Sequence, residues 1–123
     1  CNLAHDAGRH PWFHSDGAIA SIIPDMIEIG VDVINPQVPL VGVEMLGREY
    51  GGEVCFLGDV DRQQLLPFGT PKEIEGYVKK VVNALGAYDG GYIGRGELAP
   101  DVPLENARAM FEAFRRYGNY DQD

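Results

Sequence analysis

Short apolar stretches alternate with longer segments in which apolar residues recur at helical spacing, and this pattern repeats four times along the chain. The short stretches predict strands, because each is bounded by Gly, Pro, Asn or Asp residues that favour turns. Each is apolar along its length instead of alternating with polar residues, which is typical of a parallel sheet covered by helices. The expected strands span residues 12–14, 31–35, 53–57 and 91–94.

A segment of helical periodicity follows each expected strand. These segments span residues 19–30, 41–51, 70–86 and 103–114. The third has the clearest start, because Thr70 can accept a hydrogen bond from the backbone N–H of Glu73 while the Glu73 carboxylate returns one to Thr70. Pro71 then occupies the first helical position, where its missing N–H costs nothing. The inner face of the last helix is expected to carry Leu104, Ala107, Phe111 and Phe114.

Four strand-helix units predict an α/β fold with a parallel sheet. They amount to half of a (β/α)8 barrel, whose usual length of roughly 250 residues is about twice that of this chain. A doubly wound open sheet is the alternative, although the first strand lacks the glycine fingerprint of a dinucleotide site. Composition and periodicity leave both architectures open. The opening residues 1–8 are typical of the last turns of a helix that ends at Gly8, so we expect residues 1–123 to be a partial barrel domain without its N-terminal half.

Polar side chains follow each expected strand, where both architectures gather their functional groups. The candidate residues are His14 and Asp16 after the first strand, Asn35 and Gln37 after the second, Asp59, Asp61 and Arg62 after the third, and Arg95 and Glu97 after the fourth. Together they would form a cleft in which the two guanidinium groups bind acidic substrate groups.

These residues also have structural interpretations. His14 and Asp16 can cap the following helix, and the two aspartates can satisfy backbone donors in a loop. Arg62 can form a surface ion pair, and Arg95 can be a solvated turn residue. His5 and His10, which precede the first strand, are expected in solvent. The sequence alone does not choose between these interpretations.

Composition narrows the class of partner. Ten Lys and Arg against nineteen Asp and Glu give a net charge of −9, which argues against binding to nucleic acid or to an anionic membrane. Cys1 and Cys55 are the two cysteines, and Cys55 is expected to be a buried, reduced, inert thiol. Neither a signal peptide nor a membrane-spanning stretch is visible, so a cytoplasmic location is expected.

Four motifs, HSDGAI, EIGVDVINP, FLGDVDRQQLLPFGTPKEI and GYIGRGELAPDVPLENARAMFEAF, occur in an order that resembles the uroporphyrinogen decarboxylase superfamily over nearly the whole chain. The most specific part is the PxEN-type helix start from Pro103 to Asn106. The resemblance implies the C-terminal half of a β/α barrel. It also implies a lyase that needs no cofactor and removes carboxyl groups from an anionic, polycarboxylated molecule, with His14 and Asp16 as catalytic residues.

The same superfamily includes corrinoid-dependent methyltransferases, which use zinc to activate a thiol. Those resembling this chain have His-x-Cys where it has His14-Ser15-Asp16, so zinc is expected only in this alternative. A third alternative is a non-catalytic half-barrel that self-associates. A half-barrel leaves two sheet edges and one layer of interior side chains uncovered, and we therefore predict a homodimer that closes the barrel and regard the chain alone as inactive.

Overall fold

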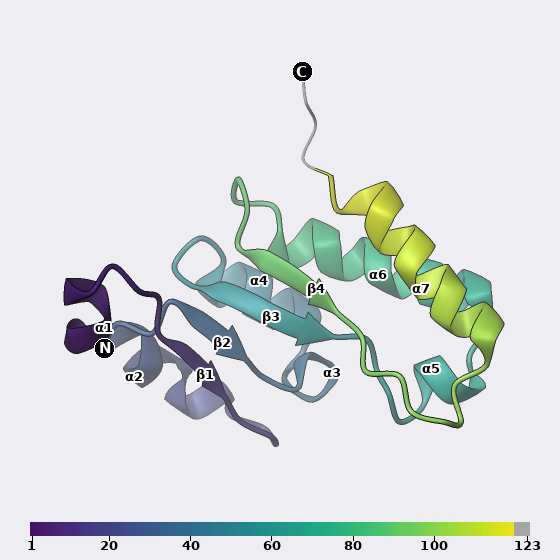
Figure 1. The fold of residues 1–123 in the computed structure, drawn as a ribbon, viewed down its shortest axis with the longest axis horizontal. Helices are drawn as coiled ribbons and strands as arrows, with labels where there is room; N and C mark the ends of the chain where they lie inside the picture. The colour runs from purple at the N-terminus through teal and green to yellow at the C-terminus, as the bar shows by residue number, and fades with distance from the viewer. Residues whose placement is uncertain (120–123) are drawn as a thin grey trace.

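One parallel sheet lies against a layer of helices in the computed structural model, which describes residues 1–119 (Figure 1). The strands are β1 (Trp12–His14), β2 (Val33–Asn35), β3 (Cys55–Asp59) and β4 (Tyr92–Arg95), and they lie side by side in this order. The helices are α1 (Asn2–Asp6), α2 (Ile23–Glu28), α3 (Val38–Val41), α4 (Val43–Tyr50), α5 (Leu65–Phe68), α6 (Pro71–Leu85) and α7 (Leu104–Tyr117), with a 3-10 turn η1 (Ala20–Ile22) before α2.

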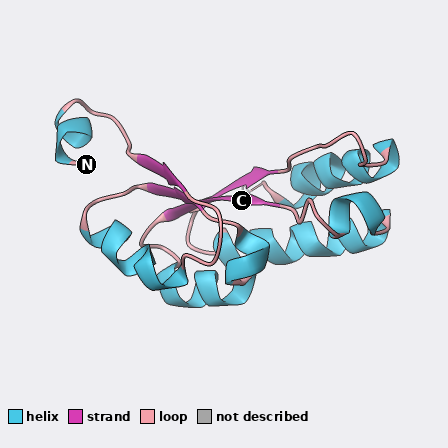
Figure 2. Cartoon of the chain, turned by 90° about the horizontal axis from the view of Figure 1, so that it is seen from below, coloured by secondary structure: helices cyan, strands magenta, loops and turns pink. Residues whose placement is uncertain are grey.

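The order of the strands decides between the two architectures. Each strand pairs in parallel with the next along the chain, and the helices that connect them lie on one face of the sheet (Figure 2). Right-handed connections that always advance in the same direction put every helix on the same side, as in a barrel. A doubly wound sheet reverses direction and covers both faces. The structure therefore confirms the partial β/α barrel.

The register of the strands determines which side chains point away from the helices. Trp12 pairs with Val33, Val33 with Cys55, and Leu57 with Ile93. Residues paired in register point to the same side, and alternate residues point to the opposite side. Ile34 and Phe56 belong to the core under the helices. The uncovered face of the sheet is consequently lined by Trp12, His14, Val33, Asn35, Cys55, Leu57, Asp59, Ile93 and Arg95.

The core forms two clusters between the sheet and the helices. One joins β2 and β3 to α2, α4 and α6, and the other lies where α5, α6 and α7 meet. The capping box at Thr70 is present as predicted. Among residues 1–119, every helix is too short or too polar to cross a lipid bilayer.

The structure corrects the prediction for the last helix. Ala107 is buried and Phe114 packs against the second cluster, but Leu104 is 77% exposed and Phe111 is 55% exposed. The buried positions include Asn106 and Met110, because α7 packs mainly on α6 and leaves its flank beside β4 uncovered. The short helices α3 and α5 were not predicted, and β3 begins two residues later than expected.

Two helical glycines should respond in opposite ways to replacement by alanine. A Cβ at Gly47 of α4 would lie 2.5 Å from the backbone oxygen of Ala84, whereas a Cβ at Gly76 of α6 would meet nothing within 4 Å. Gly76→Ala should raise the free energy of unfolding by about 1 kcal/mol through helix propensity. Gly47→Ala gains the same stabilisation from helix propensity, but its methyl group forces α4 away from α6. This overpacking lowers the free energy of unfolding by about 1–3 kcal/mol or more. Urea unfolding should show stabilisation for Gly76→Ala and destabilisation for Gly47→Ala, and an equal gain for both would contradict this close helix contact.

Candidate functional site

Polar side chains form the top layer of the uncovered face, at the carboxyl ends of the four strands. His14, Asn35, Asp59 and Arg95 are the last residues of β1, β2, β3 and β4. Register pairs His14 with Asn35 and Asp59 with Arg95. The side chains below them are mostly apolar, so the polar groups gather at one end of the half-barrel, where barrel enzymes have their active sites.

Arg95 is the centre of a network of polar contacts. Its Nη1 group donates a hydrogen bond to Asn35 Oδ1 at 3.3 Å, and its Nε lies 3.5 Å from Asp59 Oδ1. Its Nη2 lies 3.7 Å from Glu97 Oε2, and Glu97 Oε1 accepts a hydrogen bond from Arg62 Nη1 at 2.6 Å. Acidic and basic side chains alternate along this network, which runs from Asp59 to Arg95, then to Glu97 and finally to Arg62. Arg95 is therefore held in place on the sheet and is not a free turn residue.

Asp59 is the least exposed carboxyl group of this network. Its side chain is 19% exposed, and its Oδ1 atom is buried without a hydrogen-bond partner within the described residues. Burial raises the pKa of the Asp59 carboxyl above its ordinary value, while the neighbouring charge of Arg95 opposes this shift. A carboxyl group with a raised pKa retains its proton to a higher pH, as a general acid must.

His14 and Asp16 lie at the opposite edge of the sheet. His14 Nδ1 is 3.1 Å from the backbone oxygen of Asn35, and its Nε2 is 3.7 Å from Asp16. Neither side chain caps η1 or α2, so the capping interpretation is not what the structure shows. Both side chains are well exposed, at 58% and 73%. Glu97 follows β4, so it lies at the other edge of the sheet from His14 and Asp16, whereas Arg62 lies in the loop that follows β3.

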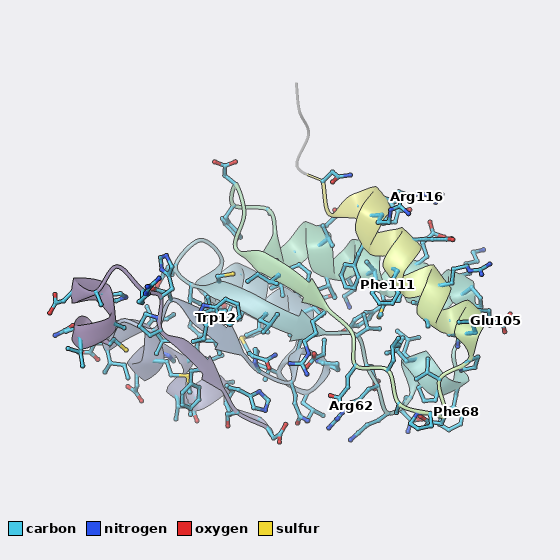
Figure 3. The ribbon with its side chains drawn as sticks, viewed as in Figure 1. Trp12, Arg62, Phe68, Glu105, Phe111 and Arg116 are labelled. Carbon is cyan, nitrogen blue, oxygen red and sulfur yellow. The ribbon has the colours of Figure 1, made fainter. Side chains whose placement is uncertain are left out.

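Gln37 and Asp61 hold the loops around this end of the sheet. Gln37 Oε1 accepts a hydrogen bond from the backbone N–H of Gly17 at 2.9 Å, which links the loops after β1 and β2. Asp61 Oδ1 accepts bonds from the N–H groups of residues 63 and 64, so the loop interpretation fits Asp61. A pocket of about 230 Å³ opens here, and its lining includes Gln37, Asp59, Asp61 and Arg62. Figure 3 shows Arg62 at this end of the sheet.

Cys55 differs from its prediction. It lies on the uncovered face at the start of β3 and is only partly buried, because the register turns Phe56 and not Cys55 toward the helices. Burial still raises the pKa of its thiol, so it is not an activated nucleophile. The apolar residues of the same face, including Trp12 and Ile93, were not predicted as part of a site, since period-2 alternation is weak in such short strands.

His5 and His10 are exposed, as expected, and both also contact Asp32. His10 Nδ1 lies 2.7 Å from Asp32 Oδ2, and His5 Nε2 lies 3.1 Å from the same oxygen. The hydrogen bond from His10 lowers the pKa of the Asp32 carboxyl, partly opposed by burial. These contacts tie α1 to the strand end opposite the polar layer. They are a structural link and not part of the candidate site.

Residues 1–119 contain no group of three or more His, Cys, Asp or Glu side chains arranged to hold a metal ion. His14 and Asp16 provide two donors, neither of which is the soft sulfur that thiol activation by zinc favours. Within residues 1–119, these two donors do not make up the set of three or four ligands that a zinc site needs.

Comparison with known proteins agrees with this architecture. No curated protein matches the chain. The family model for uroporphyrinogen decarboxylase (URO-D) matches residues 3–117, from α1 to the end of α7. This match takes in all four strands and every residue of the candidate site. The chain belongs to the uroporphyrinogen decarboxylase (URO-D) family.

Proposed function

We propose that this chain contributes half of the active site of a decarboxylase-like lyase that acts on a small molecule with several carboxyl groups. The observation that supports the proposal is the network at the carboxyl ends of β3 and β4, in which Arg95 lies between Asp59 and Glu97. Membership of the URO-D family supports the class of reaction. No cofactor is required for this chemistry.

The charges of the network suit both substrate and intermediate. Arg62 and Arg95 can bind substrate carboxylates, because guanidinium groups form paired hydrogen bonds with carboxylates. Asp16, Asp59, Asp61 and Glu97 outnumber them, so a cation that forms during the reaction is surrounded by carboxyl groups. An anionic substrate with a cationic intermediate matches this combination.

The expected reaction replaces one carboxylate by hydrogen and consumes one proton for each CO2 released. An acid protonates a carbon of the substrate and makes its conjugated system cationic. The electron pair of the bond to the leaving carboxylate then neutralises the cation as CO2 departs. Protonation of the carbon that lost CO2 and loss of the proton that was added first complete the exchange, so that one proton is consumed in total. Asp59 is the best-suited donor of this chain, because its pKa is raised. His14 and Asp16 remain candidates for the other proton transfers.

A binding measurement tests the proposal without requiring that the chain be active alone. We would titrate the protein with methanedisulfonate, whose charge stays constant between about pH 4 and pH 8. Arg95→Gln and Arg62→Gln should each weaken binding about tenfold or more, because each removes a charge-assisted hydrogen bond. Arg116→Gln is the matched control, since Arg116 pairs with Glu75 on the outside of α7, far from the network (Figure 3). Equal affinity for wild type, Arg95→Gln and Arg116→Gln would overturn the proposal.

The pH dependence of binding separates Asp59 from the arginines. As pH rises through the pKa of Asp59, above its ordinary value of 3.8, the carboxyl group gains a negative charge and should weaken binding of the anion. Asp59→Asn stays neutral and should bind more tightly than wild type at neutral pH, with the difference disappearing at low pH. A difference that grows as pH falls would contradict the assignment.

A further inference from the structure

The carboxylate of Glu97 lies between two guanidinium groups of the candidate site. Its Oε1 accepts a hydrogen bond from Arg62 Nη1 at 2.6 Å, and its Oε2 lies 3.7 Å from Arg95 Nη2. Each oxygen therefore faces a different arginine. Because guanidinium groups bind carboxylates through several N–H donors, two of them directed at one point form a position that suits a carboxylate.

The two arginines are held to different degrees. Arg95 is fixed from the side of the sheet, because its Nη1 donates to Asn35 Oδ1 at 3.3 Å and its Nε lies 3.5 Å from an Asp59 oxygen. Asn35 is a rigid support, since it is 5% exposed and its Nδ2 donates to the backbone oxygen of residue 57 at 2.6 Å. Within residues 1–119, Arg62 has Glu97 as its one ion-pair partner. Arg62 can therefore follow a ligand once Glu97 moves away.

The three charged side chains are accessible from solvent. Arg62 is 43% exposed, Arg95 is 42% exposed and Glu97 is 46% exposed. Arg62 also lines the pocket of about 230 Å³ at the carboxyl ends of the strands. Ion pairs as exposed as these contribute little to folding stability, because water competes for both partners. A carboxylate that enters from the pocket can consequently replace Glu97 at little cost to the fold.

We infer that Arg62 and Arg95 form a subsite for one carboxylate of the substrate, and that Glu97 occupies this subsite as an internal competitor. The substrate carboxylate displaces Glu97 and takes its place between the two guanidinium groups. This assignment rests on the proposed function, since it requires that both arginines bind an anionic ligand. The affinity of the site is then set by the exchange of one carboxylate for another.

The exchange changes the electrostatics of the site in the direction that the proposed reaction needs. While Glu97 pairs with the arginines, their charges compensate its own. After displacement, its carboxylate is free beside the bound molecule, where it favours a cationic intermediate. A molecule without a carboxylate at this position leaves Glu97 paired. The competitor therefore also selects for carboxylated ligands.

Titration with methanedisulfonate tests the competition by the sign of one effect. Glu97→Gln should bind this dianion about fivefold more tightly than wild type, because an exposed ion pair no longer competes with it. Glu75→Gln is the matched control, since Glu75 pairs with Arg116 at the same distance of 2.6 Å on the outside of α7 and its replacement changes the net charge equally (Figure 3). The control should bind as wild type does. Unchanged or weaker binding by Glu97→Gln would overturn the inference, because Glu97 would then be neutral to binding or would hold the arginines in place.

A second background separates competition from simple repulsion. Arg62→Gln removes the shortest contact of Glu97, so adding Glu97→Gln to it should improve affinity by less than about twofold. Repulsion between Glu97 and the dianion would persist in that background, and an undiminished gain would overturn the subsite. Circular dichroism would confirm that each variant is folded, as these exposed positions should allow.

The same titrations distinguish failure of the subsite from failure of the proposed function. If Arg62→Gln and Arg95→Gln bind as wild type does, or if neither wild type nor Glu97→Gln binds the dianion, both are overturned. If the two arginine variants bind more weakly but Glu97→Gln does not bind more tightly, the proposed function stands and the competition by Glu97 is overturned.

Discussion

Replacing Phe56 by alanine should lower the free energy of unfolding by about 3–5 kcal/mol, the largest effect expected for a single side chain of this fold. Phe56 is 1% exposed and lies near the start of β3, with β2 and β4 on either side. It is the largest fully buried side chain and belongs to the cluster that joins the sheet to α2, α4 and α6. Because neighbouring strands and helices hold the surrounding backbone, the cavity can collapse only in part.

Urea unfolding at one fixed protein concentration is the appropriate measurement, since dimer formation would make stability depend on concentration. Phe68→Ala is the matched control, because Phe68 is 77% exposed and should change stability by no more than about 0.5 kcal/mol. Domains of this size are commonly stable by only about 5–15 kcal/mol, so Phe56→Ala should leave little stability. An equal effect of both replacements would show that Phe56 is not at the centre of the core.

The sequence was sufficient to predict the fold class because local signals agree with the architecture. Each strand is bounded by turn residues, and α6 begins with a capping box at Thr70 that the structure retains. The strand order could not be read from periodicity, since both architectures use the same units. The direction of winding decides between them, and it is a property of tertiary structure. The resemblance to the URO-D superfamily supplied that information, and the match to the family model confirms it.

The candidate site was predictable in position but not in its internal contacts. Strand ends are visible in the sequence, so His14, Asn35, Asp59 and Arg95 could be selected before their geometry was known. Which acid is buried depends on register, and this makes Asp59 the least exposed carboxyl group of the network. The exposure of Phe111 was not predictable either, because helical periodicity assumes that a helix has one covered face. In α7 a second apolar flank, which includes Phe111, lies beside β4 and is uncovered within the described residues.

Asn106→Leu should lower the free energy of unfolding by about 2–3 kcal/mol. The hydrogen bonds that Asn106 makes explain why the PxEN-type helix start is a specific signal. Asn106 is 1% exposed, and its Nδ2 group donates to the backbone oxygens of Leu66 at 2.9 Å and Gly69 at 2.8 Å. Leucine keeps a similar volume but leaves both carbonyl groups without their donor, at about 1–3 kcal/mol for each buried group. Asn106 Oδ1 is buried without a partner, so its removal offsets part of the loss.

The matched control for Asn106 is Asn119, whose Nδ2 group donates to the backbone oxygen of Arg115 at an exposed site. Water replaces that bond when it is lost, and Asn119→Leu should therefore stay within about 0.5 kcal/mol of wild type. Asn106→Asp should lower the free energy of unfolding at least as much as Asn106→Leu at neutral pH. A carboxylate only accepts hydrogen bonds, so it cannot donate to the two backbone oxygens, and its charge would be buried. Urea unfolding of the three variants measures this order. If Asn106→Leu were as stable as wild type, the bonds to Leu66 and Gly69 would not be what anchors α7 to α5, and the motif would need another explanation.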